Sequence, residues 1–539
     1  MPDFGRWRES VDFTLACRRY VIGEVLAKHA RSEPRKLAFV DYTRGKRFSY
    51  DELNRRVNRL ARALQGLGIV AGDKVAFLFF NSHEIIECYF ACAKIGAIAV
   101  PLNFRFSPDE LGYCLEQSDA CCVIHGGDFA ATLNGLRSKL PLVRAYVCAE
   151  GAAGSHDHDY ETLLAAAEES EPGVLVDDDD YAQIFYTSGT TGFPKGALLT
   201  HRNYLTHAPC YLLELAQSPG GISPRDVYLQ NSPLFHAGGW GLTFSHLWFR
   251  NTVVTLRAFD AEKLLECIER ERVTITWLVA TMSTFVLGSP KFGDYDTSSL
   301  RICVSAGSPL PTVLKEKLRE KFSGLHVIDV LGQTELSAGI MALAHPEDVR
   351  RKVACVGRPL TMTEAKVVDD TGRELPAGEV GEIVYRSPQL AAGYYKKPAE
   401  TIEAYHDGWF HSGDLARRDD EGFFYLVDRK HDKIVSGGEN IFPTEVEEVL
   451  YTHPKVENCC VVGVPDPLWG EAVKAVVVLK SGAEASGREL IDYCVGKIAD
   501  YKKPKSVDFV NDLPRSSVGK VLRREVRAQY QQEKTYYTT

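Results

Sequence analysis

Hydrophobic residues in the first part of the chain alternate between the spacing of helices and the spacing of strands. Across residues 51–67, the apolar side chains Leu53, Val57, Leu60 and Leu64 recur every three or four positions, as on one face of a helix. The elements predicted next are a strand at 74–80, a helix at 83–95, a strand at 97–102, a helix at 108–117 and a strand at 120–124. This order indicates an α/β fold with layers built on mainly parallel strands.

The pattern changes in the last third of the chain. Residues 365–386 predict a hairpin that turns at 370–372, and residues 422–427 predict a further short strand. The elements predicted after that are a helix at 444–451, strands at 458–464 and 472–479, and a helix at 488–498. We therefore predict a large domain at 1–428 and a small α+β domain at 429–539, with the boundary near residues 428–433.

Length and composition fit a multidomain globular protein. The chain has 539 residues, 45% of them hydrophobic and 25% charged, and its net charge of −9 is spread over both signs. That balance argues against nucleic acid or an anionic membrane surface as the main partner. The longest apolar runs are too short to span a bilayer, and the first thirteen residues lack the apolar segment of a secretory signal. We expect a cytoplasmic protein with no transmembrane segment.

The cysteines support the same compartment. Fourteen are scattered along the sequence with no CxxC pair, and Cys121-Cys122 and Cys459-Cys460 lie within apolar strand patterns. We expect buried free thiols rather than disulfides or a zinc site.

Residues 186–196 read YTSGTTGFPKG and lie between two apolar runs. The Walker phosphate loop needs a lysine followed by a hydroxyl residue and a helix. Here Gly196 and a strand-like segment follow Lys195, so we predict a strand–loop–strand that holds phosphate through loop amides, hydroxyls and the lysine. Taken alone, a polar surface hairpin explains the segment equally well.

Five further segments give this loop a context. They are SAGSP at 305–309, DVLGQTE at 329–335, HSGD at 411–414, DR at 428–429 and LPRSSVGK at 513–520. Together with the loop they resemble, in order and spacing, the motifs of the adenylate-forming superfamily, which includes acyl-CoA synthetases, firefly-type luciferases and peptide-synthetase adenylation domains. The resemblance extends from about Val21 to Arg524.

The resemblance implies a fold and a reaction. The large domain would be a multi-layer α/β unit of two parallel-type α/β subdomains plus a small β-barrel-like subdomain, and the small domain would be mobile about a hinge near His431. The activity would be that of an AMP-forming acyl-CoA ligase. A carboxylate attacks the α-phosphorus of Mg²⁺-bound ATP to give an acyl adenylate, and the thiol of coenzyme A then displaces AMP.

The resemblance also assigns residues to the nucleotide. Lys520 would bridge the substrate carboxylate and the α-phosphate, Glu335 would bind Mg²⁺ together with Thr190, and Thr334 would contact the α-phosphate. Asp414 would accept the ribose hydroxyls, Arg429 would reach the ribose or phosphate, and Asp329 would accept the adenine amino group. The full set assigned to ATP and AMP is Thr187, Ser188, Gly189, Thr190, Thr191, Gly192, Lys195, Gly307, Ser308, Pro309, Asp329, Leu331, Gly332, Gln333, Thr334, Asp414, Arg429 and Lys520.

Two positions depart from the family pattern. Leu331 stands where the family usually stacks an aromatic residue on adenine, which predicts weaker stacking. His431 replaces the usual aspartate or lysine of the hinge. After rotation of the small domain, Gly437, Gly438 and Glu439 would line the channel for coenzyme A.

The predicted acyl pocket is apolar or small. Its residues are His236, Gly239, Trp240, Thr281, Ala306 and Gly339. It carries no acidic residue to pair an ammonium group, which predicts an uncharged fatty, aromatic or alicyclic tail. We expect the glycines at 238, 239 and 241 to free space near Trp240 for a ring or a moderately long chain. His236 is either a gate residue beside the reacting carbonyl or an imidazole held by a backbone partner.

Other functions remain to be weighed against this prediction. An acyl-AMP ligase that loads a separate carrier protein shares the first step, a luciferase-like oxygenase needs oxygen chemistry that no motif indicates, and a binding module without activity would not need Lys520, Glu335 and Asp414. The partners expected are a carboxylic acid, ATP and coenzyme A. The acid itself, a homodimer and the direction of the reaction in the cell stay open.

Overall fold

Four β-sheets organise the chain. The computed structural model describes residues 20–150, 158–187, 194–307, 310–352, 354–436, 439–516 and 521–531. Two large sheets are mostly parallel and two five-stranded sheets are mostly antiparallel. The predicted α/β fold with parallel layers and a smaller C-terminal unit is confirmed.

The first large sheet has eight strands in the order β19-β9-β8-β4-β3-β5-β6-β7. Its strands are β3 (Lys74–Leu78), β4 (Ile98–Pro101), β5 (Ala120–Gly126), β6 (Ala145–Ala149), β7 (His158–Asp159), β8 (Tyr181–Thr187), β9 (Lys195–Thr200) and β19 (Gly393–Tyr394). The helices of this stretch are α3 (Tyr50–Gly66), α4 (His83–Ile95), α5 (Pro108–Gln117), α6 (Ala130–Leu136), α7 (Tyr160–Ala166) and α8 (His201–Leu215). Among the described strands of this sheet, the antiparallel pairs are β8 with β9 and β9 with β19, at the edge that follows the glycine-rich loop.

The second large sheet has nine strands in the order β16-β15-β14-β13-β12-β10-β11-β1-β2. Its strands are β1 (Leu37–Asp41), β2 (Lys46–Ser49), β10 (Val227–Gln230), β11 (Thr252–Thr255), β12 (Ile275–Trp277), β13 (Ile302–Ala306), β14 (His326–Gln333), β15 (Ala338–Leu343) and β16 (Arg358–Pro359). The accompanying helices are α2 (Glu24–Ser32), α9 (Ala237–Trp248), α10 (Ala261–Glu271), α11 (Ala280–Leu287), α12 (Thr312–Lys321) and α13 (Pro346–Arg351). Because β10, β12, β13 and β14 are parallel, their carboxyl ends meet at one edge.

The two smaller sheets follow in sequence. The third contains β17 (Glu364–Val368), β18 (Val380–Arg386), β20 (Tyr405–His406), β21 (Trp409–Arg418) and β22 (Phe424–Arg429), with α14 (Pro398–Ala404) beside it. The fourth contains β23 (Ile434–Ser436), β24 (Glu439–Ile441), β25 (Val456–Asp466), β26 (Gly470–Leu479) and β27 (Ser506–Phe509), with α15 (Pro443–Tyr451), α16 (Gly487–Tyr493) and α17 (Arg523–Gln531).

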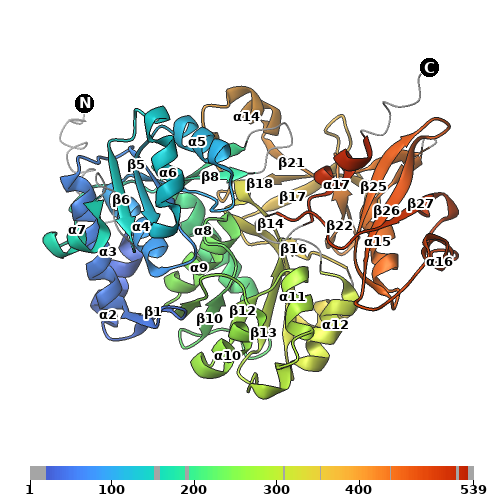
Figure 1. Cartoon of the computed structure of the whole chain (residues 1–539), viewed down its shortest axis with the longest axis horizontal. Coiled ribbons are helices and arrows are strands. Elements are labelled where there is room, and N and C mark those ends of the chain that lie inside the picture. The colour runs from blue at the N-terminus through green and yellow to red at the C-terminus, as the bar shows by residue number, and fades with distance from the viewer. Residues whose placement is uncertain are drawn as a thin grey trace, which may run out of the picture.

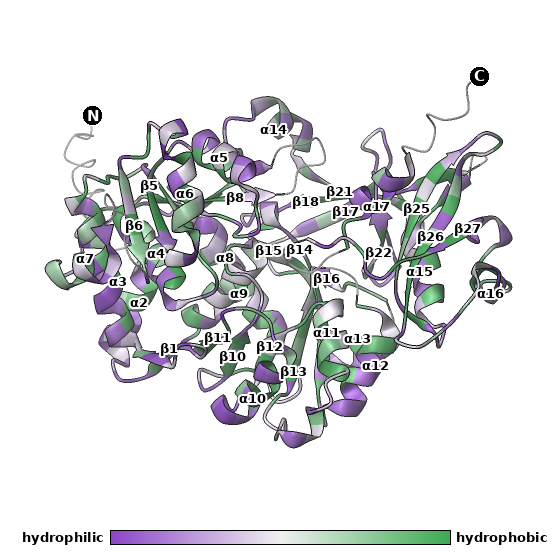
Figure 2. Cartoon of the chain, viewed as in Figure 1, coloured by the Kyte–Doolittle hydropathy of each residue, from purple (hydrophilic) through white to green (hydrophobic). Residues whose placement is uncertain are grey.

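The small C-terminal unit lies apart from the first two sheets. In Figure 1 its orange and red strands stand at the opposite end of the molecule from α2 and α3, with β17, β18 and β21 between the two ends. Figure 2 shows hydrophobic residues concentrated on β25 and β26, whereas the peripheral helix α10 is largely hydrophilic. Val461, Val473 and Val477 form part of a separate core in this unit.

Local sequence explains where the early helices begin. Ser49 and Ser107 each accept a hydrogen bond from the backbone of a glutamate three residues later, and that glutamate bonds back, so both α3 and α5 start with a capping box. Helix α4 is buried along its whole length, including Glu84 and Glu87. Arg44 donates to both oxygens of Glu84 at 2.8 Å and Arg56 Nε donates to Glu87 at 2.6 Å, so neither buried charge is unpaired.

Most of the predicted elements are confirmed, with two differences. The predicted helix at 488–498 ends at Tyr493, because Gly496 adopts a φ of 74° and a β-bridge joins Val495 to Ile498. The third sheet is an open ladder in which β17 and β20 are the ends of the main path, rather than a closed barrel, among the described strands. The domain boundary at 428/429 stays a prediction.

The prediction of buried free thiols is confirmed for the cysteines that the structure describes. Within the described ranges every cysteine is buried and free, including Cys121, Cys122, Cys459 and Cys460. Among the helices of those ranges, none is long and apolar enough to cross a membrane.

Four buried histidines predict a loss of stability in acid. Burial lowers the pKa of His29, His201, His207 and His246 to about 4 in each case. The unfolded chain, with histidine pKa values near 6.5, therefore binds more protons between about pH 6.5 and pH 4, and the free energy of unfolding falls as the pH falls across that window. Four such groups contribute a slope of up to about 5 kcal/mol per pH unit.

Urea unfolding between pH 7 and pH 4.5 measures this slope. His201, whose Nδ1 accepts a hydrogen bond from the Ile22 backbone at 3.3 Å, is the site to change. We expect His201→Asn to reduce the slope by about one quarter, because one of these four groups is removed. Equal slopes for the two proteins would contradict the assignment.

Candidate active site

The glycine-rich loop connects two antiparallel strands. Strand β8 ends at Thr187 and β9 begins at Lys195, and these two residues face each other in the ladder. The Thr187 hydroxyl donates to the Lys195 carbonyl at 3.3 Å. The predicted strand–loop–strand is therefore confirmed. The remaining loop residues assigned to phosphate, Ser188, Gly189, Thr190, Thr191 and Gly192, lie outside the described residues.

The predicted metal ligand lies on a tight turn after β14. Thr334 and Glu335 open a short 3₁₀ turn, η4 (Thr334–Leu336), and both are half-buried. Oε1 of Glu335 accepts a hydrogen bond from the Tyr394 hydroxyl at 2.7 Å. Ser337 and Ala338 follow with φ values of 63° and 155°, a strained backbone of the kind that gathers at functional sites. The Ser337 hydroxyl holds this turn by donating to the Gln389 carbonyl at 2.7 Å.

Three of the residues assigned to the nucleotide meet at one carboxylate. Asp414, on β21, is buried, and its Oδ1 pairs with Arg429 Nε at 3.0 Å. Its Oδ2 accepts a hydrogen bond from Gln333 Nε2 at 2.6 Å. Each oxygen has a second lone pair, so the carboxylate remains able to accept a ribose hydroxyl. Sequence reasoning missed that Gln333 orients this group.

The adenine side brings in a residue that the sequence did not single out. Burial raises the pKa of Asp329, and Lys315 Nζ on α12 pairs with its Oδ2 at 2.7 Å. Lys315 lies in a segment, KEKLREK, that reads as a solvated helix face. Leu331 is half-buried and packs against the core beside the third sheet. Gly307 follows β13 with a φ of 90°, while Ser308 and Pro309 lie outside the described residues.

The acyl-side residues gather at the carboxyl ends of β12 and β13. Ala306 ends β13, and its carbonyl accepts a hydrogen bond from Trp277 Nε1 at 3.2 Å. His236 precedes α9, and its Nδ1 accepts a hydrogen bond from the Gly238 backbone at 3.1 Å. The interpretation of His236 as an imidazole with a backbone partner is thus confirmed, which leaves its gating role a prediction. Thr281, on α11, is half-buried.

The expectation that glycines free space around Trp240 is wrong. A Cβ at Gly239 would lie 2.2 Å from the Pro233 carbonyl oxygen, and one at Gly241 would lie 2.5 Å from that of Ser337. These glycines let backbones approach and leave no hollow. Trp240 is fully buried and stacks on Tyr89 with 3.9 Å between ring centroids.

Gly339 and Gly332 show the same close packing. A Cβ at Gly339 would lie 2.6 Å from Val330 Cγ1. At Gly332 it would lie 1.6 Å from the Ala338 carbonyl oxygen, on the strand that pairs with β14. Both glycines therefore set the geometry of the β14–β15 ladder beside the site.

This packing predicts the effect of a single methyl group. Gly239→Ala is expected to lower the free energy of unfolding by about 1–3 kcal/mol, because the new Cβ overlaps a backbone carbonyl that cannot rotate away. Gly293→Ala is the matched control, since nothing lies within 4 Å of a Cβ there. Urea unfolding of the two variants measures the difference, and equal stabilities would contradict the close approach at Gly239.

The C-terminal unit contacts the large domain at Ser516, which precedes the segment that carries Lys520. Arg515 and Val521 pair across the base of this loop, and the Ser516 carbonyl accepts a hydrogen bond from Arg105 at 3.4 Å. Lys520 itself lies outside the described residues, as do Gly437 and Gly438. Glu439 is exposed at the start of β24. The roles assigned to Lys520, Gly437, Gly438 and Glu439 therefore stay predictions.

The predicted hinge has contacts that the sequence did not indicate. His431 is exposed, and its carbonyl accepts a hydrogen bond from Arg527 at 3.4 Å. Asp428, just before it, is buried and accepts hydrogen bonds from the backbone and hydroxyl of Thr444, both at 3.1 Å. Arg523 contacts the same carboxylate at 3.4 Å. Asp428 thus joins the last strand of the third sheet to the start of α15.

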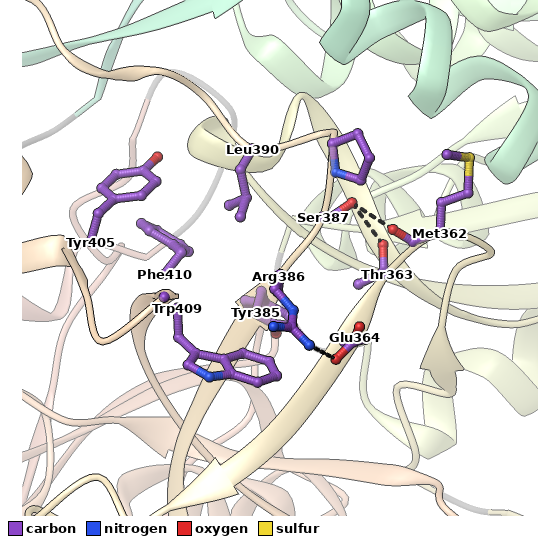
Figure 3. A pocket seen from close by; sticks show the side chains of 12 residues that line it. Met362, Thr363, Glu364, Tyr385, Arg386, Ser387, Leu390, Tyr405, Trp409 and Phe410 are labelled. Atoms are coloured by element: carbon purple, nitrogen blue, oxygen red, sulfur yellow. Dashed lines mark hydrogen bonds and ion pairs between the residues drawn. The ribbon is translucent and has the colours of Figure 1, made fainter.

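A separate cavity of about 770 Å³ opens at the ends of β17, β18 and β21. Figure 3 shows the rings of Tyr405 and Phe410 on one side, and the Trp409 indole next to the ion pair of Glu364 and Arg386 on the other. None of the residues predicted for the nucleotide or the acyl group lines it.

Comparison with known proteins agrees with this geometry. Residues 26–395 match the family described as AMP-binding enzyme, and residues 445–520 match the AMP-binding enzyme C-terminal domain. The chain is 39% identical over 487 residues to a feruloyl-CoA synthase of Amycolatopsis sp, covering 90% of this chain and 94% of the relative. It is 35% identical over 512 residues to the long-chain-fatty-acid–CoA ligase FadD13 of Mycobacterium tuberculosis, covering 94% and 98%.

Solved structures show the same fold. The anthranilate CoA ligase AuaEII in complex with anthranoyl-AMP superposes with a TM-score of 0.89 at 28% identity, covering 95% of this chain and 98% of that chain. The o-succinylbenzoate coenzyme A synthetase of Bacillus subtilis, in complex with ATP and a magnesium ion, superposes with a TM-score of 0.81 at 31% identity, covering 93% and 98%. The chain therefore belongs to the AMP-binding enzyme family and is an adenylate-forming acid–CoA ligase.

Proposed function

We propose that this ligase activates a compact carboxylic acid, with aryl acids as its main class, and transfers the acyl group to coenzyme A. The observation that carries this proposal is the closed aromatic packing at Trp240, which is stacked on Tyr89 and flanked edge-on by Phe90. A long alkyl chain has to displace this packing, whereas a short tail does not reach beyond it. The names of the feruloyl-CoA and anthranilate relatives point to the same class.

The residues on the acyl side favour an uncharged tail. Trp277, Ala306 and Gly238 are close together, and the nearest predicted polar group is the His236 imidazole. No carboxylate belongs to this set. An ammonium group placed against these side chains would be buried without a partner, which costs several kcal/mol.

The donor set at η4 suits a magnesium ion. Glu335 is half-buried, and one of its carboxylate oxygens accepts a hydrogen bond from the neutral Tyr394 phenol, which leaves the charge of the carboxylate in place. A hard carboxylate oxygen is the ligand that Mg²⁺ prefers. When bound, the ion offsets the repulsion between the substrate carboxylate and the triphosphate. The relative from Bacillus subtilis that holds ATP and magnesium supports this role.

Other residues of the chain bind the ribose, stabilise the adenylation step and line the path of coenzyme A. Asp414, fixed by Arg429 and Gln333, holds the ribose. Lys520 bridges the carboxylate and the α-phosphate, which favours the pentavalent transition state. After adenylation the small domain turns about the hinge, Lys520 withdraws, and the segment that ends at Glu439 lines the path of coenzyme A.

A substrate panel tests the class of acid. We expect benzoic, cinnamic, ferulic and anthranilic acids to include a substrate whose kcat/KM exceeds that of any straight-chain acid by at least about 10-fold. The comparison series runs from hexanoate to hexadecanoate. Rates that rise with chain length would contradict the proposal and favour the long-chain class of FadD13.

The acceptor is tested separately. Release of AMP that depends on coenzyme A, at the expense of a preformed acyl adenylate, is the expected result. AMP release that coenzyme A does not stimulate would favour transfer to a carrier protein instead.

A further inference from the structure

Residues 391–395 form a short segment, here called the crossbar, that touches both the metal turn and the phosphate loop. The Ala391 backbone donates to the carbonyl of Glu335 at 2.8 Å. From there the crossbar runs antiparallel to β9, and the Tyr395 backbone donates to the Gly196 carbonyl at 2.8 Å. The crossbar therefore fixes the distance between the turn that carries Glu335 and the strand that starts at Lys195.

One side chain of the crossbar contacts both charged residues. The Tyr394 hydroxyl donates to Glu335 Oε1 at 2.7 Å. The ammonium of Lys195 lies over the Tyr394 ring, 5.3 Å from its centroid, within the range of a cation–π contact. A single phenol thus lies between the predicted metal ligand and the lysine at the base of the glycine-rich loop.

The backbone around Tyr394 is held rigidly. Its N–H donates to the Thr401 hydroxyl at 2.9 Å. Gly393 has a φ of 135°, and a Cβ there would lie 2.7 Å from Thr401 Cγ2, so only glycine fits beside α14. These constraints aim the phenol before any ligand arrives.

A neutral donor suits this position better than a cation. Arginine or lysine on Glu335 would cancel the charge that attracts Mg²⁺, whereas a phenol fixes one oxygen and leaves the carboxylate anionic. Partners of this kind, which orient a metal ligand, typically change metal affinity by about 10- to 100-fold when they are removed.

We propose that Tyr394 is a positioning residue for adenylation, which holds Glu335 ready for the metal and sets Lys195 against the same site. This inference rests on the proposed function, since it takes Glu335 as the magnesium ligand. It assigns to Tyr394 no proton transfer and no contact with the reacting atoms.

The test compares Tyr394→Phe with Tyr395→Phe. The neighbouring Tyr395 is the matched control, because its hydroxyl donates to Asp119 at 2.9 Å and not to the site. Isothermal calorimetry measures ATP binding with Mg²⁺ and with EDTA. We expect Tyr394→Phe to weaken binding of ATP with Mg²⁺ by about 10-fold or more, to leave binding in EDTA unchanged, and Tyr395→Phe to match the wild type in both.

Kinetics give a second readout that a merely structural role would not move. In pyrophosphate exchange, the Mg²⁺ concentration for half-maximal rate should rise about 10-fold in Tyr394→Phe, with an unchanged KM for the acid and recovery of rate at saturating Mg²⁺. Transfer from a supplied acyl adenylate to coenzyme A should be unaffected. The ring is kept, so loss of the fold is not expected, and a melting temperature checks this.

The outcomes separate the two levels of the proposal. A wild type that shows acid-dependent exchange together with a Tyr394→Phe variant whose Mg²⁺ dependence is unchanged overturns the inference alone. A rate that falls without recovery at high Mg²⁺ also overturns it. A wild type with no exchange under any condition overturns the proposed function itself.

Discussion

Replacing Lys520 by alanine is expected to slow adenylation by about 10³-fold while leaving the transfer of a supplied acyl adenylate to coenzyme A nearly intact. In the first half-reaction two anions meet, and a positive charge between the carboxylate and the α-phosphate is needed only as the pentavalent phosphorus forms. In the second half-reaction no phosphorus is attacked. Loss of a residue that acts in adenylation alone must therefore lower the rate of adenylation and leave the rate of acyl transfer to coenzyme A nearly unchanged.

The described ends of the Lys520 loop support this assignment. Arg515 pairs with Val521 across its base, and Arg105 of the large domain holds the Ser516 carbonyl at 3.4 Å. Ser516, the described residue that precedes the Lys520 segment, is thus held at the large domain. Pyrophosphate exchange and single-turnover thioester formation are the two assays, and Lys505→Ala, at an exposed lysine of the same unit, is the control. If the rates of both half-reactions fell together in Lys520→Ala, the assignment of Lys520 to adenylation alone would be wrong.

Glu335→Gln is expected to lower the rate of adenylation by about 10²-fold or more, with little change in stability. The amide has the same shape and its carbonyl still accepts the Tyr394 hydroxyl, so the turn keeps its hydrogen bond. What is lost is the negative charge on a ligand of Mg²⁺. The predicted defect is therefore one of metal use and not of folding.

Pyrophosphate exchange as a function of Mg²⁺ concentration measures this defect. The exposed Glu347, on α13, provides the control variant Glu347→Gln, which should behave as the wild type. An exchange rate for Glu335→Gln equal to that of the wild type at every Mg²⁺ concentration is the outcome that removes Glu335 as the metal ligand.

The sequence predicted the elements whose signals are local. The bounds expected for the helices at 83–95 and 108–117 match α4 and α5, and their end signals are short-range: Gly96 ends α4 in the left-handed conformation and a capping box at Ser107 begins α5. The family resemblance also assigned Asp414 and Arg429 to the same nucleotide, and the two side chains form an ion pair. What spacing did not reveal is that Gln333 completes that group from a strand eighty residues earlier in the chain.

The sequence did not predict how the space around the glycines is filled, nor which residues far apart in the chain are in contact. The sequence shows that positions 239 and 241 carry no side chain, but it does not tell whether a substrate or a neighbouring carbonyl fills the space. Trp277 and Tyr394 look like ordinary core aromatics at strand ends, and only the fold places them beside Ala306 and Glu335. The pairing of Lys315 with Asp329 could not be recognised from the sequence, because Lys315 lies in a helix in which many side chains are charged.

The central claim is that this site joins a carboxylate to the α-phosphate of ATP before any thiol takes part. Exchange of labelled pyrophosphate into ATP, measured with each acid of the aryl and straight-chain panel and without coenzyme A, tests this most directly. We expect exchange that requires a matching acid and Mg²⁺. Absence of exchange with every acid, or exchange that needs coenzyme A, would contradict it.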